Sequence, residues 1–299
     1  MVGGVSTVDE LIEAGRIARV VRNSVPGLVR PHMPMIELAE KIESMILDRG
    51  GRPAFPCNIS VDSVAAHYTP PPGDRTLIPR GSVVKIDIGV VVNGYIADTA
   101  VTVSDSQLGD TLRYAAEEAL KAAIKSVKAG VKVSTVGGAI QSVITRLGFK
   151  PIRNLTGHEI KRYNLHAGVS IPNVATDGGA RLVEGHVYAI EPFVTLGDAA
   201  GEVYEAGEPT IFRVEKTGLG RLTEAEQAVV EELGDRFHGL PYTLRWLRDL
   251  GDSFLTVHGR LVKTGRVRGY PILAERSGRP VAQAEHTIVV KGDGCEVVT

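Results

Sequence analysis

The segment KIDIGVVVNGYIADTAV, Lys85–Val101, constrains the fold more than any other part of the chain. Its centre is the dipeptide Asn93–Gly94, which lies between two β-branched runs. Both residues of a two-residue type I′ turn take positive φ, and Asn and Gly are the residues that tolerate this best. The dipeptide therefore predicts a tight β-hairpin in which Val92 pairs with Tyr95.

The same pairing, continued along the hairpin, fixes the positions of two acids. Asp98 lies opposite Gly89, and Asp87 lies opposite Ala100. Because side chains alternate along a strand, the two aspartates share one face as diagonal neighbours, with Cβ atoms about 7 Å apart or less. The residues opposite them are small, so we expect room above both carboxylates.

Two acids on one face of an apolar hairpin allow two interpretations. In the first, the face is exposed or each aspartate meets its own arginine. In the second, the face is buried, and buried carboxylates need a cation or a proton. Hard divalent ions bind carboxylate oxygens, and two ions about 3.5–4 Å apart need bridging carboxylates, so a shared metal site would account for the pair. The hairpin alone leaves both interpretations open.

Three further segments carry candidate ligands. His158 directly follows a glycine in NLTGHEI, and Glu191 interrupts an apolar strand in VYAIEPFVT. Glu285 lies in another apolar strand, VAQAEHTIVV. Each residue alone is a weak indication, because structural charges often imitate sites. Their number favours a common site, although none forms a local signature such as HExxH.

The periodicity of apolar residues indicates an α+β fold. Helical spacing predicts helices at Leu11–Val21, Ile36–Leu47, Gly109–Lys128 and Ser134–Leu147. Between them lie β-rich stretches at Ser82–Ser104, His186–Thr195 and Val281–Val290. Helices that alternate with hairpins, rather than with single strands, are typical of an antiparallel sheet.

Residues 207–270 have a different pattern. They contain a capping-box spacing at Thr223 and Glu226, and helical segments at Ala225–Leu233, Thr243–Leu250 and Ser253–Val262. We expect a helical, winged-helix-like subdomain inserted into a catalytic domain made of residues 1–206 and 271–299. Its charges are mixed, so a role in packing and in walling a pocket is favoured over DNA binding.

Bulk properties exclude several classes of protein. The 299 residues are 43% hydrophobic and 23% charged, which is ordinary for a globular protein. The net charge of -1 argues against a nucleic-acid surface. There is no long apolar run for a membrane span and no secretion signal at the start. Cys57 and Cys295 make no disulfide framework, so we expect a cytoplasmic protein.

Five segments together resemble the type II, archaeal-like methionine aminopeptidases of the pita-bread metallopeptidase superfamily. The segments are Ala54–Pro70, Lys85–Ala100, Asn154–Gly168, Ala189–Phe193 and Ala282–Val290. The resemblance covers essentially the whole chain, and GLPYTLRWL and GYPIL resemble the type II insert. It implies the pita-bread (creatinase/aminopeptidase) fold, a curved antiparallel sheet covered by helices.

The resemblance also implies a dinuclear metal site with two divalent ions, Co, Mn, Fe or Zn. In the family pattern, one aspartate chelates one metal, an aspartate and a glutamate bridge both, and a histidine and a glutamate complete the other. The matching residues are, in that order, Asp87, Asp98, Glu285, His158 and Glu191. A water or hydroxide activated by both metals would be the nucleophile.

Other positions match the family's substrate site. His67 and His166 match two histidines that hydrogen bond the substrate, and Glu191 matches the proposed proton shuttle. By the type II pattern, the walls of an apolar methionine pocket would include Phe55, Leu165 and Tyr270.

The implied function is hydrolysis of the N-terminal initiator methionine from nascent polypeptides when the second residue is small. We expect a monomer acting at or near the ribosome, with no membrane and no specific nucleic-acid partner. Two alternatives stay open. An X-Pro aminopeptidase or prolidase shares the fold and the metal set but usually carries a large extra N-terminal domain. A non-catalytic pita-bread binding protein would have lost ligands, whereas every ligand position is filled here.

Overall fold

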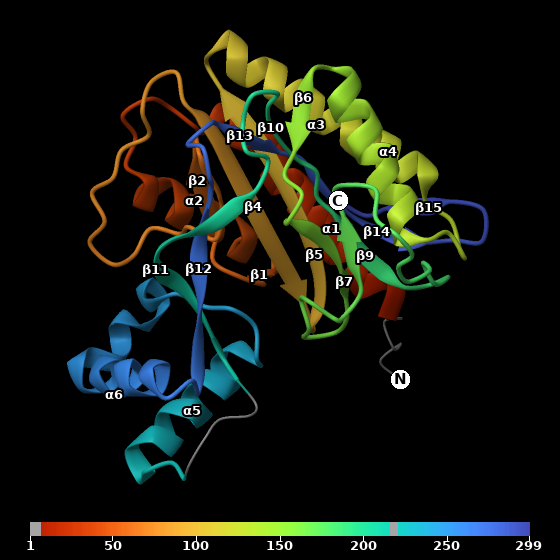
Figure 1. Ribbon diagram of the computed structural model, residues 1–299. Coiled ribbons are helices and arrows are strands. Elements are labelled where there is room, and N and C mark those ends of the chain that lie inside the picture. The colour runs from red at the N-terminus through yellow and green to blue at the C-terminus, as the bar shows by residue number, and fades with distance from the viewer. Residues whose placement is uncertain (1–6, 216–220) are drawn as a thin grey trace.

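The predicted hairpin lies in the largest sheet of the protein. In the computed structural model, which describes residues 7–215 and 221–299, β4 (Val83–Val92) and β5 (Tyr95–Ser104) pair along their full length (Figure 1). Asn93 and Gly94 have φ angles of 48° and 92°, as the turn type requires.

The register of the hairpin is also the predicted one. Gly89 pairs with Asp98, and Asp87 pairs with Ala100. The two aspartates therefore share one face of the sheet, and this prediction from the turn residues is confirmed.

The remaining strands belong to the sheet of the hairpin or to two smaller sheets. These are β1 (Arg52–Pro53), β2 (Asn58–Val61), β3 (Val64–Ala66), β6 (Phe149–Pro151), β7 (Thr156–Ile160), β8 (Ser170–Pro172), β9 (Val187–Ile190), β10 (Phe193–Leu196), β11 (Val203–Val214), β12 (Val267–Glu275), β13 (Val281–Gln283), β14 (Glu285–Val290) and β15 (Cys295–Val297). Among the described residues, the largest sheet has nine strands in the order β1-β4-β5-β14-β9-β7-β8, with β2 also on β4 and β15 on β14. Two three-stranded sheets, β13-β10-β6 and β11-β12-β3, adjoin it. The pairings are antiparallel, as expected for the α+β class.

Two of the predicted β-rich stretches are divided between sheets, which the sequence did not predict. The stretch His186–Thr195 becomes β9 and β10, which part at Glu191 and Pro192, because proline offers no N–H to a ladder. The stretch Val281–Val290 becomes β13 and β14, which part at Ala284. The Ala284 N–H donates to the carbonyl of Pro192 at 3.3 Å, so the two breaks face each other.

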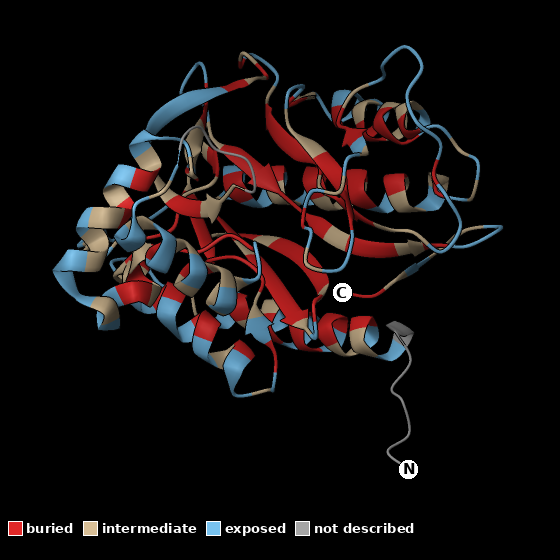
Figure 2. Ribbon diagram, turned by 90° about the horizontal axis from the view of Figure 1, so that it is seen from below, coloured by how far each residue is buried: buried red, intermediate tan, exposed pale blue. Residues whose placement is uncertain are grey.

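Four long helices form where the periodicity predicts them. They are α1 (Thr7–Ser24), α2 (Met35–Leu47), α3 (Gln107–Ser126) and α4 (Val133–Arg146), with the short 3-10 helix η1 (Val25–Gly27) after α1. Figure 2 shows most strands buried and the helices buried on one side and exposed on the other, while β11 and β12 are partly exposed. None of the helices in the described residues is long and apolar enough to cross a membrane.

The helices pack on the face of the sheet that is opposite to the acids. Ile86 and Ile88 of β4 pack in one core with α1 and α2. Ile288 and Val290 of β14 pack in a second core with α3 and α4. Since side chains alternate along a strand, Asp87 between Ile86 and Ile88 points away from these helices.

The segment between β11 and β12 holds the predicted helices. They are α5 (Glu224–Phe237), the 3-10 helix η2 (Leu244–Leu250) and α6 (Gly251–Lys263), which project from the sheets at the lower left of Figure 1. The capping box is confirmed: Thr223 Oγ1 accepts from the Glu226 N–H at 3.3 Å, and Glu226 Oε2 accepts from the Thr223 N–H at 2.9 Å. Both ends of residues 207–270 are strand rather than helix, because β11 and β12 continue into this range.

Candidate metal centre

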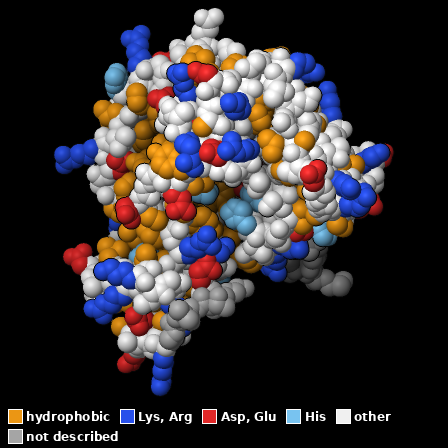
Figure 3. Space-filling view, in the orientation of Figure 1, with side chains coloured by type: hydrophobic (Ala, Val, Ile, Leu, Met, Phe, Trp, Pro, Cys, Tyr) orange, Lys and Arg blue, Asp and Glu red, His pale blue; other side chains and the backbone are white. Residues whose placement is uncertain are grey.

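The five predicted ligand residues converge on one cavity of about 350 Å³. They come from four strands and from the break after β9: Asp87 (β4), Asp98 (β5), His158 (β7), Glu191 and Glu285 (β14). In Figure 3, histidine side chains lie at the bottom of a hollow that is bordered by hydrophobic side chains. Residues far apart in the sequence are thus brought to one buried place.

Three of these residues form a group with the spacing of metal ligands. Asp98, His158 and Glu285 each offer one ligand atom, and these three atoms lie within 4.8 Å of one another. Nε2 of His158 is 3.6 Å from Asp98 Oδ2 and 3.6 Å from Glu191 Oε1. These separations exceed the length of a hydrogen bond, so the groups face each other without bonding directly.

Several polar atoms of the cluster are buried without a partner. Among the described residues, no hydrogen-bond partner is present for Asp87 Oδ1, Asp98 Oδ1 or His158 Nδ1. Buried polar atoms are normally satisfied, and leaving them unpaired is costly. Carboxylate oxygens with one imidazole suit divalent first-row metals, so these residues fit a metal centre.

The pKa values of the clustered side chains also indicate a metal centre. Burial raises the pKa of Asp87 to about 7, although hydrogen bonds with Asp98 and Gln283 partly offset this. Burial, with the neighbouring carboxylates, holds the pKa values of Asp98, Glu191 and Glu285 well above the usual range. Without a cation the cluster therefore retains protons, and bound cations would displace them.

The two predicted substrate histidines face the same cavity. The ring of His166 lies 4.4 Å from that of His158, centroid to centroid, and the ring of His67 lies 5.6 Å from that of Tyr270. His67 Nδ1 is 3.3 Å from the carbonyl oxygen of Pro271. Burial lowers the pKa of His67 and lowers that of His166 to about 4. Both rings are therefore neutral near pH 7 and offer one donor and one acceptor each.

The predicted wall residues Phe55, Leu165 and Tyr270 also line the cavity. The ring of Phe55 lies over Gly89, where an added Cβ would be 2.5 Å from Phe55 Cδ1. The sequence interpretation left the space above Gly89 for the carboxylates. In the structure the Phe55 ring occupies that space, so the absence of a side chain at Gly89 makes room for the cavity wall and not for the carboxylates.

Some residues of the site were not predicted. Gln283 Nε2 donates to Glu285 Oε2 at 3.3 Å, and Asn58 lies in the cavity wall opposite Asp87 in strand register. Alternation in AQAEHT could have placed Gln283 beside Glu285. Asn58 depends on the pairing of β2 with β4, for which the sequence carries no turn signal. Three further wall residues are Phe193, Ile211 and Pro241.

Comparison with known proteins gives consistent results. The model of metallopeptidase family M24 matches residues 9–291. The methionine aminopeptidase of Pyrococcus horikoshii is 46% identical over 295 residues, covering 98% of this chain and 99% of that protein.

Solved structures are similar over nearly the whole chain. A thermophilic Arx1 superimposes with a TM-score of 0.82 at 17% identity, covering 99% of this chain and 91% of that one. The methionine aminopeptidase of Rickettsia prowazekii gives a TM-score of 0.69 at 22% identity, covering 99% of both chains. These similarities confirm the expected pita-bread fold.

Proposed function

The chain belongs to metallopeptidase family M24, among the methionine aminopeptidases, and on this premise we propose how its buried site works. The chain is a metal-dependent aminopeptidase that removes N-terminal methionine. One observation carries the assignment of its site: four carboxylates, those of Asp98 and Glu285 fully buried, and a neutral imidazole meet with unpartnered atoms in a cavity with apolar walls.

We propose that the cluster holds two divalent ions, Co, Mn, Fe or Zn. When ionised, Asp87, Asp98, Glu191 and Glu285 carry four negative charges, which two divalent cations balance. By resemblance to the family, Asp98 and Glu285 would be the ligands shared by both ions, and their ligand atoms lie within 4.8 Å of one another. When bound, the ions supply an activated water and Lewis-acid stabilisation of the developing oxyanion.

The residues around the cluster would orient the peptide and move protons. His67 and His166 are neutral because of burial, so each has a single N–H. His166 can donate its N–H to the scissile peptide, whereas the N–H of His67 faces the Pro271 carbonyl oxygen and leaves its Nε2 to accept a hydrogen bond from the substrate. Glu191 lies at the edge of the cluster, and burial raises the pKa of its carboxyl group. A carboxyl group with a raised pKa can take up a proton and pass it to the leaving amine.

The proposed methionine pocket is formed by apolar side chains. Phe55, Leu165 and Tyr270 line it and would enclose an unbranched thioether side chain. The proposed substrates are the N-termini of nascent polypeptides whose second residue is small.

We further propose that residues 207–270 form an inserted subdomain, with residues 1–206 and 271–299 as the catalytic domain. The insert contributes Ile211, Pro241 and Tyr270 to the cavity wall. This contribution supports a role in closing the pocket rather than in binding nucleic acid.

The test is a metal-resolved activity assay on purified protein. Chelation should abolish cleavage of a Met-Ala-Ser peptide, and returning about two equivalents of Co²⁺ or Mn²⁺ should restore it. An Ala-Pro peptide, the substrate of the prolidase alternative, should remain uncut. Cleavage of only the Ala-Pro peptide would overturn the substrate assignment, and a protein that binds no divalent metal would overturn the catalytic one.

A further inference from the structure

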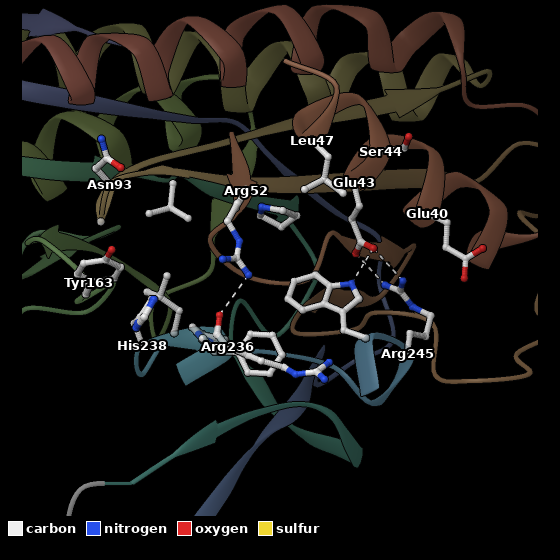
Figure 4. Close-up of a pocket in the computed structure, with 17 residues that line it drawn as sticks. Glu40, Glu43, Ser44, Leu47, Arg52, Asn93, Tyr163, Arg236, His238 and Arg245 are labelled. Carbon is white, nitrogen blue, oxygen red and sulfur yellow. Dashed lines mark hydrogen bonds and ion pairs between the residues drawn. The ribbon is translucent and has the colours of Figure 1, made fainter. Parts of the chain in front are cut away.

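A buried ion pair joins the insert to the catalytic domain. Arg245 in η2 donates to Glu43 in α2 twice, from Nη1 to Oε2 at 2.9 Å and from Nη2 to Oε1 at 2.8 Å. The side chains are 1% and 8% exposed, respectively. Trp246 Nε1 also donates to Glu43 Oε2, at 2.9 Å. Figure 4 shows Glu43 and Arg245 facing each other from the two sides of a crevice between α2 and the insert.

The ion pair also reaches two segments of the catalytic domain. Arg245 Nε donates to the carbonyl of Pro70 at 2.7 Å, and Nη2 donates to Thr69 Oγ1 at 3.0 Å. Glu43 Oε1 accepts from the Cys57 N–H at 3.1 Å. Thr69 Oγ1 donates to the Cys57 carbonyl at 2.8 Å and so ties the two segments together.

These two segments carry residues of the substrate site. Phe55 lies two residues before Cys57, and His67 lies two residues before Thr69. His67 has a φ of 66°, a left-handed conformation that a non-glycine residue keeps only when its surroundings hold it. We propose that the Glu43–Arg245 pair is a positioning device through which the insert holds His67 and the Phe55 wall in their working places.

A purely mechanical fastening would look different, and the same two elements contain one. Arg248 of η2 and Glu40 of α2 form an ion pair at 3.5 Å with side chains 52% and 47% exposed. Their charged groups have no hydrogen bond to the Cys57 or Thr69 segments among the described residues. The exposed pair is therefore a matched control for the buried one.

The variants are chosen so that they fold. Removing only one partner leaves a buried charge without a counter-ion, whereas replacing both partners by apolar residues of similar size is often tolerated. We would therefore compare E43M/R245M with the control E40M/R248M. A third variant, Thr69→Val, keeps the ion pair and removes the hydroxyl that connects it to the Cys57 carbonyl.

The measurements are kcat and KM on a Met-Ala-Ser peptide, metal content, melting temperature, and the ¹⁵N-histidine NMR resonance of His67 in the metal-free protein. We expect E43M/R245M to bind metal like the wild type, to lose about tenfold or more in kcat, and to shift the His67 resonance. KM should also rise, because a displaced Phe55 side chain would enclose the methionine side chain less well. Thr69→Val should reproduce the kcat loss, and the control should stay within about twofold of the wild type.

Two outcomes would overturn the inference. One is a folded E43M/R245M with the kcat and the His67 resonance of the wild type. The other is a Thr69→Val protein with the kcat and the His67 resonance of the wild type. This second outcome is decisive if the double variant does not fold. The roles of His67 and Phe55 rest on the proposed function, and the NMR measurement separates the two failures. A wild type that cuts no Met peptide contradicts the function, while a His67 resonance that no variant moves contradicts the positioning.

Discussion

Gly89 offers a direct test of the proposed methionine pocket. It pairs with Asp98 across the hairpin, and the ring of Phe55 lies over it. A Cβ at this position would be 2.5 Å from Phe55 Cδ1, whereas carbon atoms in contact are about 3.5–4.0 Å apart. In Gly89→Ala the ring must therefore move by about 1 Å or more. Such overpacking typically costs about 1–3 kcal/mol of unfolding free energy.

The displaced ring should narrow the pocket and weaken substrate binding. If about 1.4 kcal/mol of the cost falls on the bound peptide, KM for a Met-Ala-Ser peptide rises about tenfold. Steady-state kinetics and urea unfolding measure the two effects, and metal content should stay unchanged because Gly89 is not a ligand.

Two further variants make this test specific. In G89A/F55L the smaller side chain relieves the overlap, so part of the lost stability should return. Gly138 in α4 is the matched control, because the nearest atom to an added Cβ there is 3.8 Å away. Gly138→Ala should leave KM unchanged and add up to about 1 kcal/mol of stability. A Gly89→Ala protein with wild-type KM and stability would refute the placement of Phe55.

Three other predictions concern the ligands, the histidines and the insert. Asp98→Asn keeps the size but removes a proposed bridging charge, so metal content should fall and turnover should drop by orders of magnitude; unchanged values of both would contradict the bridging role. His67→Ala should lower kcat while keeping the metal content, and a metal-depleted variant would show that His67 is misassigned. His258 is 3% exposed, its Nε2 is 2.9 Å from the Tyr242 hydroxyl, and burial lowers its pKa to about 4. Because this pKa is depressed, its contribution to stability is present above pH 6.5 and is lost as the pH falls towards 4. The loss is about 3 kcal/mol at most, and His258→Gln should reduce it in unfolding measurements across that range; an unchanged pH dependence would exclude His258 as the cause.

The part of the site that could be predicted depends on local rules. The turn residues Asn93 and Gly94 fix the register of β4 and β5, and register alone puts Asp87 and Asp98 on one face. Helix periodicity and the capping box at Thr223 likewise act within a few residues. Such features are encoded close to where they act, so a single sequence is sufficient to predict them.

The rest depends on contacts between distant segments. That Glu191 and Glu285 meet Asp98 follows from the pairing of β14 with β5 and β9, for which nothing local is specific. Glu43 and Arg245 are 202 residues apart, so the periodicity of apolar residues could not predict their pairing either. The grouping of the five ligands came from resemblance to a known family, and so did the methionine specificity.

The facing breaks at Pro192 and Ala284 have a consequence for protein engineering. At this corner a pair of strands leaves one sheet and enters another, and the ladder between them is interrupted. Glu191 and Glu285 border that interruption, and both residues line the cavity of the proposed site. Redesign towards a continuous, more stable ladder would alter the backbone that carries both proposed ligands. Stability and activity therefore oppose each other at this corner, and thermostabilising changes are better placed in α3 and α4.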